Sequence, residues 1–394
     1  MIKKRKIITF IFLIIFLFST SLWAKDKTIN LWISWEGKEK YIEIAEKFQR
    51  ETGIKVNINS VPKLYDKVKT VAKGGGLLPD IAITRNTYIG GLKDLKIIYP
   101  IPESLHKGLS EKGKMAFTYH DKLFGIPFYF DVQVIYYNPF LLKKANLSVP
   151  SSSWTLKDME EYGRKLKKLK GIIPLVWGAY SPYYFAGFEY SFKKDCIKCE
   201  RERFFSSATA KAILFYKKLL KEGIGVGMDR NAILAKFKDG KAGFIIFGSF
   251  IIPDFIKDNV SFGILPLPVN SETGRRVASY LDYKGFVVFH KIKNGDEVYK
   301  FLKFIKDPEI QFEFSNPLYK FPDNKEAQNK VFSENSYLSH LRETVNSGIL
   351  MPKDPIYEYY NKALANVLKL VLKKNIPIEK AFSAGRKYLK GREK

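Results

Sequence analysis

The chain has 394 residues, of which 46% are hydrophobic, and a formal net charge of +27. This length allows two sizeable hydrophobic cores, so we expect two lobes. The positive charge could indicate nucleic acid, an anionic membrane or an acidic ligand. However, the lysines are spread along the chain rather than gathered in one block, so we interpret them mainly as solvated helix faces and expect no nucleic-acid partner.

Residues 1–24 have the pattern of a signal peptide. Four basic residues precede an apolar run at 7–18, and Ala24 ends a passable cleavage site. An uncleaved membrane anchor is the alternative, although the run is shorter than the ~20 apolar residues of a full span. No cysteine lies near Ala24, so no lipid-attachment cysteine is available. We expect a soluble, exported protein in the periplasm or outside the cell.

The two cysteines, Cys196 and Cys199, form a single C-x-x-C pair. In an exported chain such a pair favours a small structural disulfide. A zinc site or a redox-active pair remains as an alternative, but the four histidines are scattered singly along the chain. We expect no cofactor and no metal.

The first hundred residues alternate strands and helices. Residues 28–33 and 54–58 alternate in polarity as strands do, and the helical spacing at 41–53 lies between them. Two strands with an intervening helix predict a βαβ unit and a parallel sheet. A helix at 65–72 and a strand at 78–83 follow. Because ligands bind beyond the carboxyl ends of such strands, the loops at 35–38 and 85–88 are candidate ligand contacts.

The segment at 123–138, LFGIPFYFDVQVIYYN, contains one carboxylate, Asp131, in a run that favours extended structure. One interpretation places Asp131 on the solvated face of an edge strand. The other places it at a hinge between two lobes, facing a cleft and accepting hydrogen bonds from a polar ligand.

The alternation continues to the end of the chain, with no low-complexity linker. The expected helices are 156–169, 208–221, 233–238, 297–305 and 357–390 with a break at 376–377; the expected strands are 173–177, 242–247, 262–266 and 280–290; and 180–185 is expected to be an aromatic loop. A chain of this kind passes between lobes more than once.

Four segments carry a resemblance to a known family. They are TINLWISWEGKEKYIEIAEKFQRETGIKVNI, LLPDIAI, FKDGKAGFIIFGSF and GILMPKDPIYEYYNKAL. In this order they resemble the bacterial extracellular solute-binding proteins of the sugar-transport type, family 1, which include the maltose/maltodextrin-binding protein. The resemblance runs from about residue 28 to about residue 390 and covers the whole mature chain.

The resemblance implies an α/β fold of the periplasmic binding protein type II class, with two lobes joined by crossover strands and a ligand cleft between them. We expect residues 25–130 plus 285–320 to form the N-terminal lobe and residues 131–284 plus 321–394 the C-terminal lobe. It also implies a monomer that binds a sugar or oligosaccharide and delivers it to the membrane permease of an ABC transporter.

Carried over by position, the resemblance implies a set of ligand-binding residues. They are Trp35, Glu36, Lys38, Arg85, Asn86, Tyr88, Asp131, Tyr183, Tyr184, Phe250, Asp282 and Tyr357. Aromatic rings stack on the apolar faces of a sugar, and charged groups and amides bind its hydroxyls, so the set suits a carbohydrate.

Two alternative functions remain open. The positive charge and two pairs of adjacent tyrosines, Tyr183-Tyr184 and Tyr359-Tyr360, could indicate a protein of the same fold that binds glycerol phosphate, another anionic polyol or ferric iron. A pair such as Glu36 and Asp131 could in principle hydrolyse a glycosidic bond. The common motifs of hydrolases, metalloproteases and nucleotide-binding enzymes are missing from the sequence, so we expect that the protein is not an enzyme.

Overall fold

The computed structural model describes residues 27–193, 204–289 and 295–392. The signal peptide expected at 1–24 and the cysteine pair, Cys196 and Cys199, lie outside these residues, so both remain predictions. Within the described residues, no helix is both long and apolar enough to span a bilayer.

The first sheet is built around the βαβ unit expected from the sequence. Strand β1 (Thr28–Ile33) pairs in parallel with β2 (Lys55–Ser60), and helix α2 (Lys38–Thr52) connects them. Strand β3 (Ile81–Arg85) pairs in parallel with the other edge of β1. The alternating burial of β1 follows its alternating polarity, which confirms the period-two prediction.

The segment around Asp131 is where the chain leaves the first sheet. Strand β7 (Ile126–Asp131) belongs to that sheet, and β8 (Gln133–Tyr137) belongs to the second. Only Val132 separates the two strands. Asp131 therefore occupies the last position before a crossover between the two halves of the molecule.

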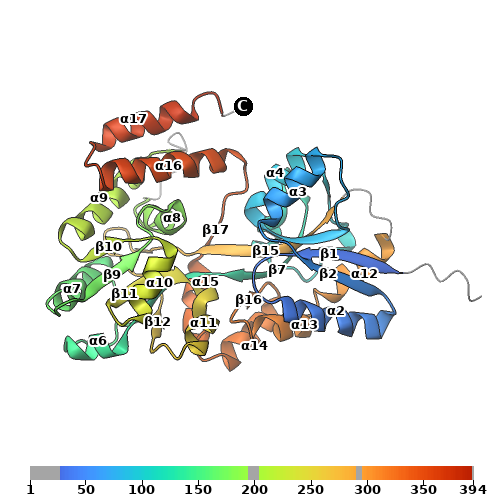
Figure 1. The fold of residues 1–394 in the computed structure, drawn as a ribbon, viewed down its shortest axis with the longest axis horizontal. Coiled ribbons are helices and arrows are strands. Elements are labelled where there is room, and N and C mark those ends of the chain that lie inside the picture. The colour runs from blue at the N-terminus through green and yellow to red at the C-terminus, as the bar shows by residue number, and fades with distance from the viewer. Residues whose placement is uncertain (1–26, 194–203, 290–294, 393–394) are drawn as a thin grey trace, which may run out of the picture.

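The second sheet has the order β10-β9-β11-β8-β12. Its strands are β9 (Ile173–Trp177), β10 (Gly225–Gly227), β11 (Ala242–Gly248) and β12 (Gly263–Leu265), together with β8. Strand β15 (Tyr280–Phe289) then returns to the first sheet, where it lies between β7 and β3. In Figure 1, β15 and β7 run between the two halves of the molecule.

A third crossover follows β17 (Ile349–Leu350), which pairs with the start of β15. The chain then enters helices α16 (Ile356–Leu372) and α17 (Ile378–Leu389), which cover the half that contains the second sheet (Figure 1). These repeated crossovers confirm the two-lobed type II fold expected from the sequence.

The remaining helices cover the two sheets. They are α3 (Leu64–Lys73), α4 (Ile89–Asp94), α5 (Glu111–Phe117), α6 (Pro139–Lys144), α7 (Leu156–Leu166), α8 (Pro182–Ser191), α9 (Ser207–Lys221), α10 (Arg230–Lys238), α11 (Ile252–Lys257), α12 (Gly295–Phe304), α13 (Pro308–Ser315), α14 (Lys325–Glu334) and α15 (Arg342–Ser347).

One expectation about local structure was wrong. The segment expected to be an aromatic loop at 180–185 is largely the first turn of α8, which begins at Pro182. Proline is well suited to the first helical position because the amide that it lacks has no partner there. Aromatic residues occupy both faces of this helix, so the sequence shows no polar side from which a helix could be recognised.

Two hydrophobic clusters support the halves. One is built on the first sheet and continues along the crossovers onto β11 and α11, and the other lies between the second sheet, α9 and α16. Strand β16 (Phe321–Pro322) pairs with β7 in the first sheet, whereas we assigned residues 321–394 to the second lobe. The lobe boundaries themselves remain a prediction.

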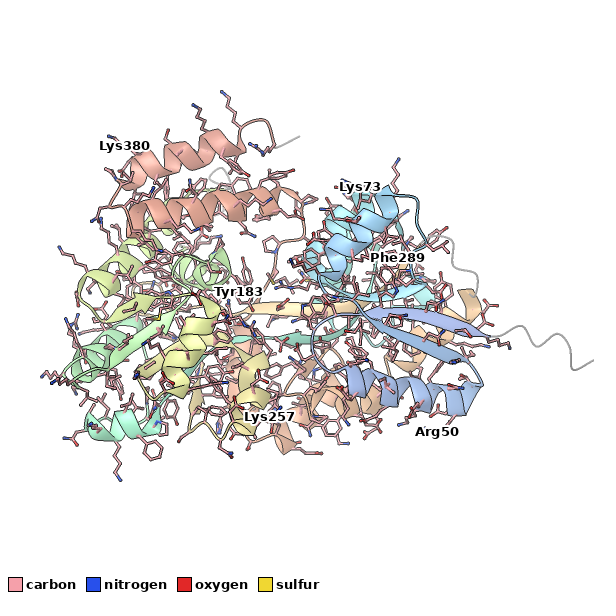
Figure 2. The ribbon with its side chains drawn as sticks, viewed as in Figure 1. Arg50, Lys73, Tyr183, Lys257, Phe289 and Lys380 are labelled. Carbon is pink, nitrogen blue, oxygen red and sulfur yellow. The ribbon has the colours of Figure 1, made fainter. Side chains whose placement is uncertain are left out.

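The exposed charges lie on the outside of both halves. Arg50, Lys73, Lys257 and Lys380 are all exposed and point away from the centre, whereas Tyr183 lies where the halves meet (Figure 2). Their positions fit the interpretation of the lysines as solvated helix faces.

Candidate functional site

A cavity of about 960 Å³ lies between the two halves of the molecule. Small-molecule sites in proteins have volumes of ~300–1,000 Å³, so this cavity is at the large end of that range. Ten of the twelve predicted ligand-binding residues line it: Trp35, Glu36, Arg85, Tyr88, Asp131, Tyr183, Tyr184, Phe250, Asp282 and Tyr357. That these residues bind a ligand remains a prediction.

The other two predicted residues are not part of the cavity lining. Lys38 is the first residue of α2, where its side chain is exposed to solvent. Asn86 is completely buried, and its amide nitrogen donates a 3.0 Å hydrogen bond to the carbonyl oxygen of Met351. Asn86 thus holds the segment after β17 against the first half.

Trp35 lies in the loop after β1 and exposes its side chain at the cavity. Its φ angle of 67° is in the left-handed region, which a bulky residue rarely adopts. Its relative exposure is 39%, which is high for a tryptophan. Strained backbone of this kind is concentrated at binding sites in proteins.

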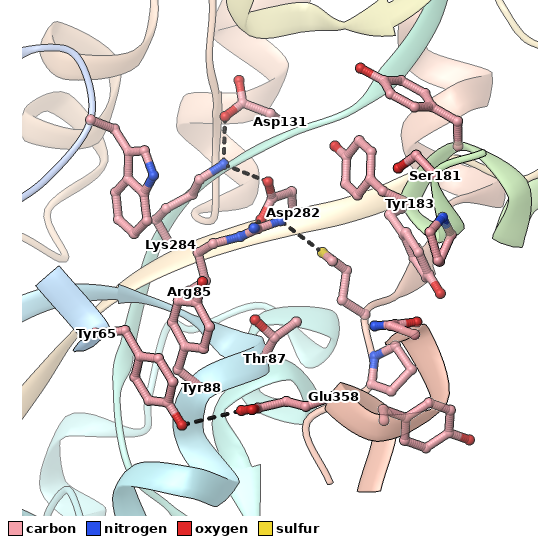
Figure 3. A pocket seen from close by; sticks show the side chains of 18 of the residues that line it. Tyr65, Arg85, Thr87, Tyr88, Asp131, Ser181, Tyr183, Asp282, Lys284 and Glu358 are labelled. Atoms are coloured by element: carbon pink, nitrogen blue, oxygen red, sulfur yellow. Dashed lines mark hydrogen bonds and ion pairs between the residues drawn. The ribbon is translucent and has the colours of Figure 1, made fainter. Parts of the chain in front are cut away.

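A chain of six charged side chains that alternate in sign runs along the cavity, and all of them except Lys320 belong to its lining. Its members, in order, are Glu36, Lys320, Asp131, Lys284, Asp282 and Arg85. The nitrogen of Lys284 lies 2.7 Å from Asp131 and 3.1 Å from Asp282, and Arg85 lies 2.7 Å from the other oxygen of Asp282. Figure 3 shows Lys284 between the two aspartates. We call these six residues the charged floor.

Strand register explains how the charged floor forms. Asp131 in β7 and Asp282 in β15 are direct cross-strand partners in an antiparallel pair. Because side chains of a strand alternate between its faces, Lys284 lies on the same face as Asp282. A bulge between Lys284 and Gly285 then shifts the register of β15 against β7.

Burial and pairing together determine the charge states on the floor. The side chains of Asp131 and Lys320 are each 1% exposed. Burial by itself would raise the pKa of Asp131, but the ammonium groups of Lys284 and Lys320 lower this pKa to about 2. Burial opposes the charge of Lys320, yet Asp131 and Glu36 raise its pKa above the usual value. Asp131 is therefore a buried, ionised group at the crossover, and its placement on a solvated edge is wrong.

Another part of the cavity lining is largely aromatic. Tyr183 and Tyr184 come from α8, and Phe250 comes from the short helix η4 (Ser249–Ile251). Arg230, the first residue of α10, places its guanidinium group 5.1 Å from the centre of the Phe250 ring. We call these four residues, with Tyr280 and Tyr357, the aromatic wall.

The hydroxyl group of Tyr183 is buried and has no hydrogen-bond partner among the described residues. Burial raises the pKa of Tyr183 well above its usual value, so the hydroxyl is neutral. Buried polar groups in proteins are nearly always hydrogen-bonded. A ligand oxygen in the cavity would satisfy this hydroxyl.

The mouth of the cavity contains a contact between the two halves. The hydroxyl of Tyr65 in α3 donates a 3.2 Å hydrogen bond to Glu358 in α16 (Figure 3). The ring of Tyr65 stacks on Tyr88, with 4.0 Å between ring centres.

The sequence analysis missed four residues at or beside the cavity: Tyr65, Glu358, Lys284 and Lys320. For Lys284 alone a local signal existed, because Asp282 and Lys284 alternate within an otherwise apolar strand.

The chemistry of the site is that of a receptor for a polar molecule with apolar faces. Within residues 27–193, 204–289 and 295–392, no cluster of three or more metal-ligating side chains occurs. The cavity offers paired charges, hydroxyls and ring faces. The fold and the interlobe cavity together define a two-lobed periplasmic binding protein of type II.

The family follows from comparison with known proteins. The model of the bacterial extracellular solute-binding proteins matches residues 34–312, and the chain belongs to this family. The maltodextrin-binding protein MdxE of Bacillus subtilis is 24% identical over 77% of this chain and 75% of its own length. The galactooligosaccharide-binding protein of Bacillus subtilis is 26% identical over 75% of this chain and 73% of its own.

Solved structures share the fold. The maltose/maltodextrin-binding domain MalE from Bdellovibrio bacteriovorus bound to maltotriose covers 93% of this chain and 99% of that structure, with a TM-score of 0.76 and 22% identity. MalX from Streptococcus pneumoniae in complex with maltopentaose covers 92% and 100%, with a TM-score of 0.79 and 18% identity. The family and these relatives are solute-binding proteins.

Proposed function

We propose that this protein is the exported sugar-binding receptor of an ABC importer. It binds a neutral sugar or oligosaccharide in the cavity between its lobes and delivers it, as a monomer, to a permease in the membrane. The observation that carries this proposal is that residues of the charged floor and of the aromatic wall line the same large cavity.

A carbohydrate ligand is bound best where both charged groups and aromatic rings are available, as on the charged floor and the aromatic wall. The C–H face of a sugar ring packs on an aromatic ring, while its hydroxyls form hydrogen bonds that are stronger when one partner is charged. Tyr183 and Phe250 supply rings, and Arg85 and Asp282 supply charged groups in the same cavity. The sugar-binding names of the relatives, such as MdxE and the galactooligosaccharide-binding protein, support this substrate class.

The charge balance of the cavity argues against an anionic ligand. Six carboxylates (Glu36, Asp66, Asp131, Asp282, Asp354, Glu358) and five cations (Lys69, Arg85, Arg230, Lys284, Lys362) line it. The cavity is therefore close to neutral, although the chain carries +27. A phosphorylated polyol would bind better in a cavity with an excess of cations.

Of the two adjacent tyrosine pairs, Tyr183 and Tyr184 line the cavity, whereas Tyr359 and Tyr360 are not placed to form an iron site there. Neither Tyr359 nor Tyr360 belongs to the cavity lining. Tyr360 is buried against Phe204 and Phe205, whereas Tyr359 is exposed at the surface. Because the Tyr360 side chain is packed in the core and the Tyr359 side chain is exposed, the two do not converge on one ion.

Delivery to a permease rests on the class of the relatives. A relative in Streptococcus pneumoniae that is 24% identical is the solute-binding lipoprotein of a maltooligosaccharide ABC transporter. Closure of two lobes around a ligand is the usual conformational change of such proteins, and it gives the permease a distinct shape to recognise.

A thermal-shift screen tests the proposal. Neutral mono- and oligosaccharides are compared with glycerol 3-phosphate and ferric ion, each at low and high salt. We expect stabilisation by at least one neutral oligosaccharide that is nearly independent of salt, because the ligand carries no charge. Stabilisation by glycerol phosphate or iron only, or loss of binding in high salt, would contradict the proposal.

A further inference from the structure

Both carboxylate oxygens of Asp131 are occupied by the protein. One oxygen accepts hydrogen bonds from Lys320 at 2.9 Å and from the hydroxyl of Ser249 at 3.3 Å. The other accepts from Lys284 at 2.7 Å. An ionised carboxylate has about four acceptor sites, so little capacity remains for a ligand. The residue that the sequence singles out as a ligand-binding carboxylate is thus engaged with its neighbours.

Lys284 differs from Asp131 in this respect. Its ammonium group has three donors, and Asp131 and Asp282 accept two of them. Among the described residues no oxygen or nitrogen acceptor occurs for the third, although the ammonium nitrogen also lies 5.6 Å from the centre of the Tyr129 ring. Lys284 belongs to the cavity lining. A strongly hydrated group held at a cavity with a spare donor provides a fixed contact for a ligand acceptor.

We propose that Lys284 is a specificity-determining residue that donates a hydrogen bond to a neutral oxygen of the ligand, a sugar hydroxyl or ring oxygen. Asp131 is then a positioning residue, which holds Lys284 in place rather than contacting the ligand. This inference rests on the proposed function.

The surrounding charges indicate what kind of ligand group fits. Asp131 and Asp282 flank the ammonium group of Lys284 and balance it together with Lys320 and Arg85. An anionic ligand group would lie close to these two carboxylates and be repelled. A sugar amine would meet the ammonium group itself. A neutral oxygen acceptor avoids both penalties, so neutral sugars are favoured over acidic and amino sugars.

Lys320 provides a matched control. Like Lys284, it is buried, donates to Asp131 and has a second carboxylate partner, Glu36. Unlike Lys284, it does not belong to the cavity lining. Replacing either lysine by methionine leaves each buried carboxylate with one cation, so both variants should fold and lose comparable stability.

The experiment compares these two variants with the wild-type protein by calorimetry. The probes are maltotriose, maltopentaose and a galactooligosaccharide, and the tightest wild-type ligand is used throughout. We expect Lys284→Met to weaken binding about tenfold or more and Lys320→Met to change it by less than about threefold. Equal losses, or an unchanged affinity in Lys284→Met, would overturn the inference and leave the proposed function intact. If the wild-type protein bound no probe, the proposed function would fail and this inference with it.

Two further measurements do not depend on the folding of Lys284→Met. In wild-type protein with ¹⁵N-labelled lysine side chains, ligand should shift the ammonium signal of Lys284 more than that of Lys320; the reverse order would overturn the assignment. The positioning role of Asp131 predicts that Asp131→Asn loses affinity and that the charge-balanced variant Asp131→Asn/Lys320→Met recovers most of it. No recovery would mean that Asp131 contacts the ligand directly.

Discussion

The floor and the wall of the cavity are built in different ways. On the floor, charged side chains from β7, β15 and the loops beside them pair with one another. On the wall, the rings of Tyr183, Tyr184 and Phe250 are held by packing and leave polar atoms such as the Tyr183 hydroxyl without partners.

Because of this difference, the two groups of residues should contribute differently to the stability of the fold and to ligand affinity. A charge that is paired inside the protein contributes to the fold, and removing one partner exposes the other to an apolar environment. A ring of the wall, or the buried hydroxyl of Tyr183, has no such partner to lose. Apart from Lys284, changes on the floor should therefore act first on stability, and changes on the wall first on ligand affinity.

The change with the largest expected effect is Asp131→Ala. It leaves Lys284 and Lys320 without their shared carboxylate, and breaking a buried ion pair from one side costs about 3–5 kcal/mol. Chemical denaturation of the unliganded protein measures this loss. The control is Asp66→Ala at the exposed mouth of the cavity, which should change stability by less than about 0.5 kcal/mol. If Asp131→Ala were as stable as its control, the floor would not be a structural network.

A second buried carboxylate, Asp323, sharpens the comparison because it has hydrogen-bond donors instead of paired cations. It accepts bonds from the hydroxyl and the backbone amide of Ser110, at 2.5 and 3.1 Å. Burial raises the pKa of Asp323 to about 7, and the bonds from Ser110 only partly offset this. The pKa of Asp323 is higher in the folded than in the unfolded state. Between about pH 4 and pH 7, Asp323 is therefore protonated in the folded protein and ionised in the unfolded chain.

We therefore expect the free energy of unfolding to fall as pH rises from about 5 to about 7.5, with a contribution from Asp323 on the order of 3 kcal/mol. Denaturation curves across this range test it, with Asp323→Asn as the reference because it cannot ionise. The difference between wild type and variant should change with pH and level off above about pH 8. A pH-independent difference would show that Asp323 is ionised throughout.

On the wall, Tyr183→Phe removes the unpartnered hydroxyl and keeps the ring. The free protein should be equally stable or more stable, by up to about 1 kcal/mol, because a buried unsatisfied group is lost. Sugar affinity should fall by about 1 kcal/mol because the ligand loses one hydrogen bond. Calorimetry and thermal unfolding measure the two changes, and a loss of stability with unchanged affinity would contradict them.

The smallest effect is expected at the cysteine pair, which lies outside the described residues. If Cys196 and Cys199 form a small structural disulfide, Cys196→Ser should leave sugar affinity unchanged. Calorimetry with the tightest neutral ligand checks this. A large loss of affinity would mean that the pair shapes the cavity.

Much of the architecture could be predicted from local sequence. The alternating polarity of 28–33 and the helical spacing that follows it lead directly to the βαβ unit in the structure. The extended segment with the single carboxylate Asp131 is the first crossover. Ten of the twelve residues implied by the family resemblance line the cavity, because the order of the motifs fixes which loops meet at the carboxyl ends of the strands.

What the tertiary structure decided is which side chains meet. Lys320 and Asp131 are 189 positions apart in the chain, and they are brought together because β16 pairs with β7. Asn86 follows β3 directly, yet it points into the protein and holds Met351 instead of lining the cavity. Periodicity depends on neighbouring residues and is visible in sequence, whereas ion pairs depend on strand register and crossover geometry. The sequence by itself therefore determined the elements and the crossover, and only the folded chain determined that the carboxylate at this crossover is bound by two lysines.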